Sequence, residues 1–191
     1  MVSKQFTSFI QLYNVALLLV ISIASVVSVH DSGIEERLHA ELLALGFPNG
    51  ELPNLAPAFG NYVDVVQVDK LLFLSSAAPQ TPAGTFVTGR VPNEISIDDA
   101  IRAAKFSCVR QVNRIKNYLG NLNRVKKIVF INGKIQTQPD FVNHTLIVDG
   151  CSAFLVNVFS DEVGKHARTS GGLQSLPFNV TVEIETIVEV K

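Results

Sequence analysis

The chain has 191 residues, 47% of them apolar, and a formal charge of −1. These values exclude an intrinsically disordered chain and fit a single domain with a substantial core. Two cysteines, Cys108 and Cys151, are too few for a disulfide scaffold, and they are too far apart for a zinc-ligand pair.

The N-terminal segment, residues 1–29, is predicted to lie outside the domain. No charged residue occurs between Gln5 and Val29, and a long apolar run follows one basic residue, Lys4. This pattern is typical of a secretory signal peptide, which would send the protein into the secretory pathway or out of the cell. An uncleaved membrane anchor is the alternative, because the run is long enough to cross a bilayer, and a buried core helix is a third interpretation.

The remaining residues, 30–191, are predicted to form one domain that begins with a helix over residues 33–46. Ser32 and Glu35 have the spacing of a capping box, and apolar residues then recur at helical intervals. Gly46 is expected to end this helix.

Two short apolar segments follow, Val63–Val68 and Leu71–Ser75, separated only by Asp69 and Lys70. This spacing predicts a tight β-hairpin. The second segment is almost continuously apolar, so we expect both faces of that strand to be covered.

The clearest helix is predicted from Ile97 to Leu119, with Ser96 as its N-cap and Gly120 at its end. Its apolar stripe is formed by residues that recur three or four positions apart. They are Ile101, Ala104, Cys108, Val112, Ile115 and Leu119. A strand over Val125–Asn132 is expected next.

A second helix is predicted over Leu146–Phe159, followed by two closing strands within residues 166–175 and 180–190. After the N-terminal helix, the order is therefore β-β-α-β-α-β-β. One sheet with two helices on one face is the natural packing, which makes an α+β domain. The other sheet face must meet water or another subunit, and the apolar strands favour an oligomer.

Motifs of the common hydrolases, kinases and metal sites are missing. His30, His39, His144 and His166 are scattered without metal-ligand spacing, so surface or structural roles are favoured. The two cysteines fall on core stripes of the two long helices. Buried, unreactive thiols are the favoured interpretation, and a disulfide between the helices is the alternative.

Residues 102–134 carry nine basic side chains and no acidic one. Such a run can attract a phosphate backbone, and RNA binding is therefore one functional hypothesis. The solvated face of one helix and its following loop is the favoured interpretation, because the net charge of the chain is negative.

Arg168 is the most unusual polar residue of the predicted strands, because it stands mid-strand among small residues and before Gly171-Gly172. Small neighbours leave space beside a guanidinium and allow another chain or a ligand to approach. Arg168 is therefore a candidate for carboxylate binding, with an ordinary edge-strand charge as the alternative. Glu183, on the following strand, is expected nearby or else to face solvent.

The order and spacing of several segments resemble those of the Rid (YjgF-like) proteins, the reactive-intermediate imine deaminases. The similarity covers nearly all of the chain from Ile34 to Lys191 and is greatest to the branch with an extra N-terminal helix. The matching segments are Pro57–Tyr62, Leu71–Ser75, the helix after Ser96, Gly164–Arg168, Leu176-Pro177 and Val182–Glu185.

The resemblance implies a chorismate-mutase-like fold and a homotrimer with clefts lined by two subunits. In active deaminases of the family, an arginine at the position of Arg168 holds the substrate carboxylate, and a tyrosine at the position of Tyr62 closes the pocket. A glutamate at the position of Glu183 is associated with the attacking water. The remaining substrate-binding candidates by resemblance are Ser75, Thr169 and Ser170.

The activity implied by the resemblance is hydrolysis of a 2-imino acid, or its enamine tautomer, to a 2-keto acid and ammonia. No metal or organic cofactor is implied. Two further hypotheses remain: a non-enzymatic trimer that binds small carboxylates or a protein partner, and a ribonuclease or RNA-binding protein. A membrane partner is expected only if the N-terminal segment is retained.

Overall fold

The computed structural model describes residues 33–55 and 57–191. The predicted leader, residues 1–29, and the predicted capping residue Ser32 lie outside the described residues. Among the described residues, none of the helices combines the length and apolar character that a membrane crossing requires.

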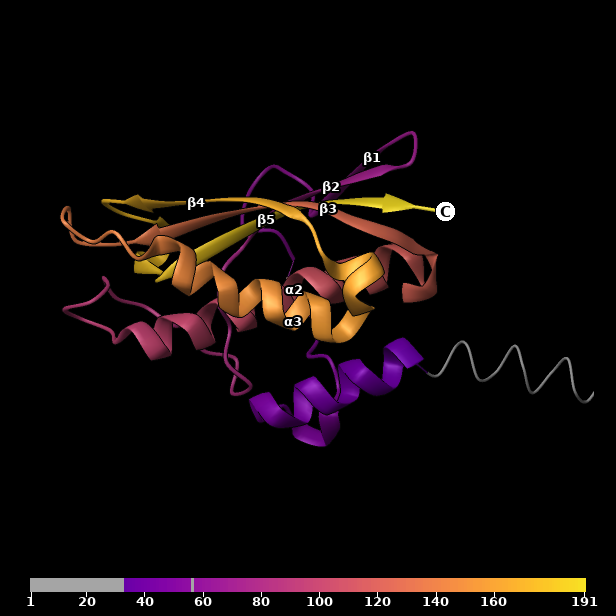
Figure 1. Ribbon diagram of the computed structural model, residues 1–191, viewed down its shortest axis with the longest axis horizontal. Helices are drawn as coiled ribbons and strands as arrows, with labels where there is room; N and C mark the ends of the chain where they lie inside the picture. The colour runs from indigo at the N-terminus through magenta and orange to yellow at the C-terminus, as the bar shows by residue number, and fades with distance from the viewer. Residues whose placement is uncertain (1–32, 56) are drawn as a thin grey trace, which may run out of the picture.

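The domain is built on one five-stranded sheet with two long helices on one face (Figure 1). The strands are β1 (Val65–Val68), β2 (Leu71–Ala77), β3 (Val125–Gln136), β4 (Ala167–Leu173) and β5 (Val182–Val190). The helices are α2 (Ile97–Leu119) and α3 (His144–Gly164), and the 3-10 turns are η1 (Pro48–Gly50), η2 (Leu122–Arg124) and η3 (Pro177–Asn179). The predicted α+β class and element order are confirmed.

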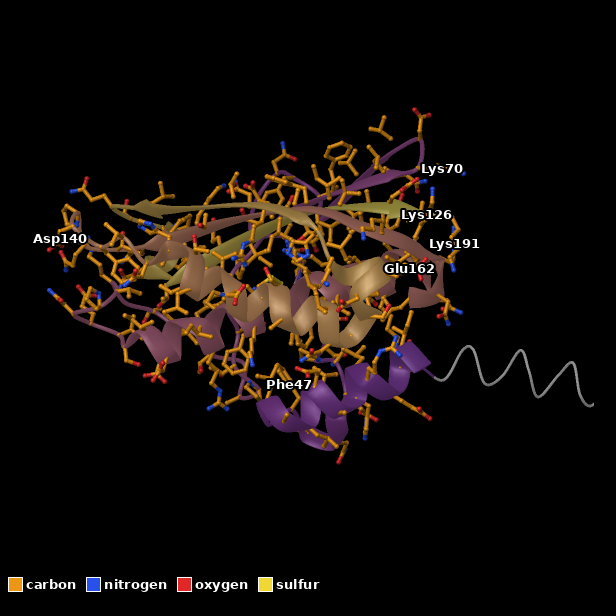
Figure 2. All side chains as sticks on the ribbon, viewed as in Figure 1. Phe47, Lys70, Lys126, Asp140, Glu162 and Lys191 are labelled. Carbon is orange, nitrogen blue, oxygen red and sulfur yellow. A yellow bond between two sulfur atoms is a disulfide. The ribbon has the colours of Figure 1, made fainter. Side chains whose placement is uncertain are left out.

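An N-terminal helix over residues 33–45 forms a third layer beneath α2 and α3 (Figure 1). It ends at Gly46, whose φ of 87° is readily adopted by glycine. Phe47, labelled in Figure 2, then packs edge-on against Phe106 of α2, with ring centroids 5.9 Å apart. This layer covers the side of α2 that faces away from the sheet, so the middle of α2 is buried almost all round.

The sheet order is β1-β2-β5-β3-β4, with β3 and β4 parallel and the other neighbours antiparallel. The parallel pair arises because α3 carries the chain back along the face of the sheet between β3 and β4. The last strand, β5, then enters the centre of the sheet instead of pairing with β4. The predicted proximity of Arg168 and Glu183 is therefore wrong, because β3 separates the strands that carry them.

The pleat also places these two residues on opposite faces. Arg168 lies opposite Ile131, which is buried beneath the helices, whereas Glu183 lies opposite Lys134 on the open face. The pairing is regular from Ile131 to Ile135 of β3, so alternation along the strands fixes this assignment there.

The two long helices cross closely at Gly150 of α3. A Cβ atom at that position would lie 2.4 Å from the carbonyl oxygen of Ile101 on α2, so only glycine fits there. The close crossing brings Cys108 and Cys151 within 5.5 Å between Cα atoms, and they form a disulfide. The favoured interpretation of free thiols is therefore wrong, and the alternative pairing is the one present.

The open face of the sheet is apolar on and beside β1 and β2. Leu72 and Leu74 are buried under the helices, but Phe73 between them is 41% exposed. Val66 and Val68 on β1 are also exposed on this face. Within a single chain, only one face of β2 is thus covered. We still expect its open face to be covered by another copy of the chain.

Candidate functional site

A pocket of about 310 Å³ opens beside β2 and the start of β5. Tyr62, Ser75 and Glu183, which come from three separate segments of the sequence, line it together. Three of the predicted site residues are therefore brought to one place by the fold.

A β-bulge shapes one wall of this pocket. The β2–β5 register shifts between Leu74 and Ala77, and this shift releases the backbone of Ser75 and Ser76 from regular pairing. Gln111 of α2 donates from Nε2 to the carbonyl oxygen of Ser75 at 3.1 Å and to that of Ile184 at 2.5 Å. Gln111 thereby connects the bulge of β2 to the neighbouring strand β5.

Arg114, one helical turn beyond Arg110 on α2, is a buried cation whose two Nη atoms both contact oxygen atoms. Its Nη2 lies 2.6 Å from Oδ1 of Asp64, and its Nη1 donates to the carbonyl oxygens of Ser75 at 2.7 Å and Ser76 at 3.2 Å. Burial lowers the pKa of Arg114, and Asp64 opposes that shift. Arg114 of α2 therefore stabilises the bulge by hydrogen bonds from the helix side of the sheet.

Arg110 lines the same pocket but has fewer partners. Within the described part of the chain, its hydrogen bonding is limited to a long contact of 3.4 Å with the carbonyl oxygen of Ala78. Its guanidinium carbon lies 5.9 Å from the ring centroid of Phe86. Burial, and then the neighbouring charge of Arg114, lower the pKa of Arg110.

Three phenylalanines form an aromatic cluster at the pocket. Phe59 contacts Phe86 and Phe178 with ring centroids 6.1 and 5.3 Å apart, and Phe86 stacks on Phe178 at 6.3 Å. Phe59 and Phe178 are 61% and 66% exposed. The pocket therefore combines an apolar rim with buried cationic groups.

Glu183 is the acid of this pocket, and its pKa is raised. Burial is the main cause; Lys134 and a hydrogen bond from Ser76 oppose it, and the charge of Glu185 adds to it. The raised pKa makes the Glu183 carboxylate a stronger base than an exposed glutamate, which suits it to accept a proton.

Glu185, two residues along the same face, has the opposite shift. Its burial is outweighed by hydrogen bonds from Lys134, Asn132 and Ser76, and its pKa is lowered. Thr169 extends this polar row onto β4, where its hydroxyl donates to Oδ1 of Asn132 at 2.9 Å.

Arg168 lies outside this pocket, on the helix-facing side of the edge strand β4. Its Nη1 donates to Oδ1 of Asp149 and to Oγ of Ser152, each at 2.8 Å. His166 contacts the same serine hydroxyl through Nε2 at 3.1 Å, and burial lowers the pKa of this histidine. The next helix-facing residue, Ser170, shares a hydrogen bond of 3.2 Å with Thr145.

The YjgF/chorismate mutase-like family, described as putative endoribonuclease, matches residues 36–190. The chain belongs to the YjgF family. It is also 32% identical over 154 residues to protein TCP17 of Trypanosoma cruzi, a match that covers 81% of this chain and 94% of that protein.

Two solved structures of similar length share the fold. Protein Atu1372 of Agrobacterium tumefaciens, of unknown function, has a TM-score of 0.74 and 33% identity over 85% of this chain and 99% of its own. A putative endoribonuclease from Shewanella oneidensis has a TM-score of 0.73 and 25% identity over 82% and 99%. The YjgF-family fold is thus shared over nearly the whole described domain.

In this YjgF-family chain, the predicted site residues divide into two groups. Tyr62, Ser75 and Glu183 meet in the pocket, whereas Arg168 and Ser170 lie on the other side of the sheet. Thr169 lies on the pocket's side of the sheet but two strands away from Glu183. The fold of a single chain therefore does not bring Arg168 to Glu183.

The basic run of residues 102–134 does not form one charged patch. Arg110 and Arg114 are buried, and Lys116, Lys126 and Lys134 form ion pairs with Glu35, Glu189 and Glu185 respectively. The fold disperses these charges over several faces, so the structure adds no support to RNA binding.

Sequence reasoning missed the role of Arg110 and Arg114 in the pocket, because it assigned both to a solvated helix face. The signal for their burial was that Arg110 and Arg114 lie four residues apart on α2, with Gln111 between them and the apolar stripe of the helix beside them. Their burial comes from the end of β2 and the loops beside it, where Ser75, Ser76 and Ala78 accept their hydrogen bonds. The aromatic cluster gave no signal, since its members come from three different loops.

Proposed function

We propose that this protein hydrolyses 2-imino acids or their enamine tautomers to 2-keto acids and ammonia, in clefts shared by neighbouring subunits of a homotrimer. The observation that carries this proposal is the meeting of Tyr62, Ser75 and Glu183 in one pocket. The resemblance assigned these three residues to a site, and each comes from a different part of the chain.

The chemistry needs one positioned acid–base group. Water adds to the electrophilic imine carbon and passes one proton to the nitrogen, which gives a carbinolamine. Its hydroxyl proton then also passes to the nitrogen as the C–N bond breaks. The products are a ketone carbonyl and ammonia. A carboxyl group with a raised pKa, such as Glu183, is suited to accept the proton and return it to nitrogen. Positioning of the reactants supplies the rest of the acceleration.

Arg168 is the proposed partner of the substrate carboxylate. Both of its hydrogen bonds within the described chain leave from Nη1, so Nε and Nη2 remain for a bidentate contact. Its ion-pair partner Asp149 has a side chain that is 64% exposed, and such surface pairs are weak. A substrate carboxylate can therefore displace Asp149 at little cost.

A neighbouring subunit is needed to combine these groups. Arg168 is carried by the edge strand of the sheet, and the pocket with Glu183 lies two strands away. The exposed apolar side chains Val66, Val68 and Phe73 give the open face a surface that a second copy can cover. In the proposed trimer, Arg168 of one subunit serves the pocket of the next.

The test is hydrolysis of 2-iminopropionate, generated in the assay from alanine by an amino-acid oxidase. Wild type is expected to accelerate pyruvate formation above the spontaneous rate, and Arg168→Ala and Glu183→Gln are expected to lose most of that acceleration. Lys165→Ala, an exposed charge beside β4, is the matched control and should retain it. Binding of small carboxylates without any acceleration would instead identify a non-enzymatic binding trimer.

A further inference from the structure

We infer that the pocket selects substrates with a second anionic group, namely 2-imino acids whose side chain ends in a carboxylate, and that Arg110 binds this group. The inference rests on the proposed function for the imine end of the substrate. It adds the chemical identity of the group at the other end of the substrate.

The first argument is an imbalance of buried charge. Arg110 and Arg114 are only 5% and 4% exposed and lie one turn apart on α2. A single carboxylate, that of Asp64, is paired with them, and it contacts Arg114. A guanidinium does not give up its proton at any ordinary pH, and a buried charge without a counter-ion is costly. The arrangement therefore favours one further anion at Arg110.

The second argument is the unused hydrogen-bonding capacity of Arg110. A guanidinium has five N–H donors. Within residues 33–55 and 57–191, Arg110 makes one hydrogen bond, at 3.4 Å from Nη1. The Nε atoms of Arg110 and Arg114 are both buried without a partner, so the two arginines differ in the contacts of their Nη atoms. Arg114, by comparison, contacts three oxygen acceptors at 2.6–3.2 Å. Of the two arginines that line the pocket, Arg110 is the one free to bind a ligand.

The third argument is the aromatic rim. Phe178 has a φ of 56°, a left-handed conformation that is unfavourable for a bulky residue, and its ring is 66% exposed. A left-handed backbone and an exposed ring are each unfavourable on their own. Both place an apolar surface beside Phe59 and Phe86 at the pocket, where it can pack against the methylene groups of a ligand side chain. The volume of about 310 Å³ accommodates a small molecule of this kind.

The two ends of the pocket are electrostatically distinct. The charges that act on Glu183 are those of Lys134 and Glu185, on the open face of the sheet. The groups that act on Arg110 are Arg114, Asp64 and Tyr62. A substrate that contacts both groups thus meets an acid–base group at Glu183 and, at Arg110, a cation that no carboxylate of the described residues contacts directly.

The test compares two stable product-like acids of equal carbon number by isothermal titration calorimetry. 2-Oxoglutarate carries the second carboxylate, and 2-oxopentanoate lacks it. Wild type is expected to bind 2-oxoglutarate roughly tenfold more tightly or better, because hydrogen bonds to a charged group are among the stronger ones. Arg110→Gln should remove this preference, so that the variant binds the two acids with similar affinity.

Arg102→Gln is the matched control, because Arg102 is an arginine of the same helix that also stacks on a phenylalanine, Phe106, outside the pocket. It should keep the preference for 2-oxoglutarate. Phe178→Gly removes the rim ring and suits the backbone at that position. This variant should remain folded and bind both acids more weakly.

Equal affinity of wild type for the two acids would overturn the inference, whether or not Arg110→Gln folds. Retention of the preference in folded Arg110→Gln would do so as well. If the preference is absent but 2-iminopropionate is still hydrolysed, the proposed function stands without this inference. If the Arg110-dependent preference is present and no imine is hydrolysed, the anion site stands and the proposed function fails.

Discussion

The Nη1 atom of Arg168 donates at 2.8 Å to both Asp149 and Ser152, and it thereby ties the edge strand β4 to helix α3. In the proposed reaction, Asp149 competes with the substrate carboxylate for this guanidinium. Asp149→Asn is therefore expected to lower KM by about two- to fivefold, the scale of an exposed ion pair, with kcat little changed. Initial-rate kinetics check this. An increase in KM would show that Asp149 assists substrate binding.

The raised pKa of Glu183 predicts how stability depends on pH. The folded state holds this proton more tightly than the unfolded state, so stability is lost as pH rises above the ordinary carboxyl value of 4.5. Glu183→Gln does not titrate. It should therefore raise the Tm at pH 7.5, and the advantage should vanish at pH 4.

Glu185 provides the matched control for this measurement, because hydrogen bonds lower its pKa on the same sheet face. Its stabilising contribution is present at neutral pH and is lost on acidification. Glu185→Gln should accordingly lower the Tm at pH 7.5 and have a smaller effect at pH 4. Equal effects of both variants at both pH values would contradict the proposed environments.

Asp64 is the counter-ion for two buried arginines. Asp64→Asn leaves both guanidiniums uncompensated, and breaking such a pair from one side is strongly destabilising. Because Asp64 is itself 26% exposed, we expect a loss of about 2 kcal/mol, below the range for fully buried pairs. Urea unfolding measures this loss. An unchanged midpoint would show that Arg110 and Arg114 are hydrated or otherwise compensated.

The exposed apolar part of the sheet predicts the behaviour of the assembly. Phe73→Glu places a charge in the centre of that surface, and sedimentation should show dissociation of the proposed trimer into smaller species. Val142→Glu is the control, since Val142 is 79% exposed in the segment between β3 and α3. A wild-type protein that sediments as a monomer would remove the basis for a shared cleft.

Local patterns predicted the fold well. As expected, α2 begins after its N-cap Ser96 and ends at Gly120. Alternation along β5 also predicted which of its residues face the helices. The sheet order was not predictable in the same way, because nothing local to β5 indicates that it pairs with β2 and β3 instead of β4. The position of β5 depends on the crossover through α3 and on how all the strands pack together against the helices.

The candidate site was predictable only in part. The resemblance placed Tyr62, Ser75 and Glu183 in a site, and the fold brings them together. The separation of Arg168 from Glu183 follows from the order of the strands and from the pleat of the sheet. Neither can be predicted from the residues at those two positions. The environment of Arg110 depends on contacts with Ala78 and Phe86 and on the neighbouring Arg114, which only the tertiary fold brings together.

The most direct test of the shared cleft is complementation between two inactive variants. Arg168→Ala and Glu183→Gln are unfolded and refolded together, so that mixed trimers form, and hydrolysis of 2-iminopropionate is measured against each variant refolded alone. If one subunit supplies the guanidinium and its neighbour the carboxyl group, random mixing restores about a quarter of the wild-type activity. No activity above that of the separate variants would contradict a cleft built from two subunits.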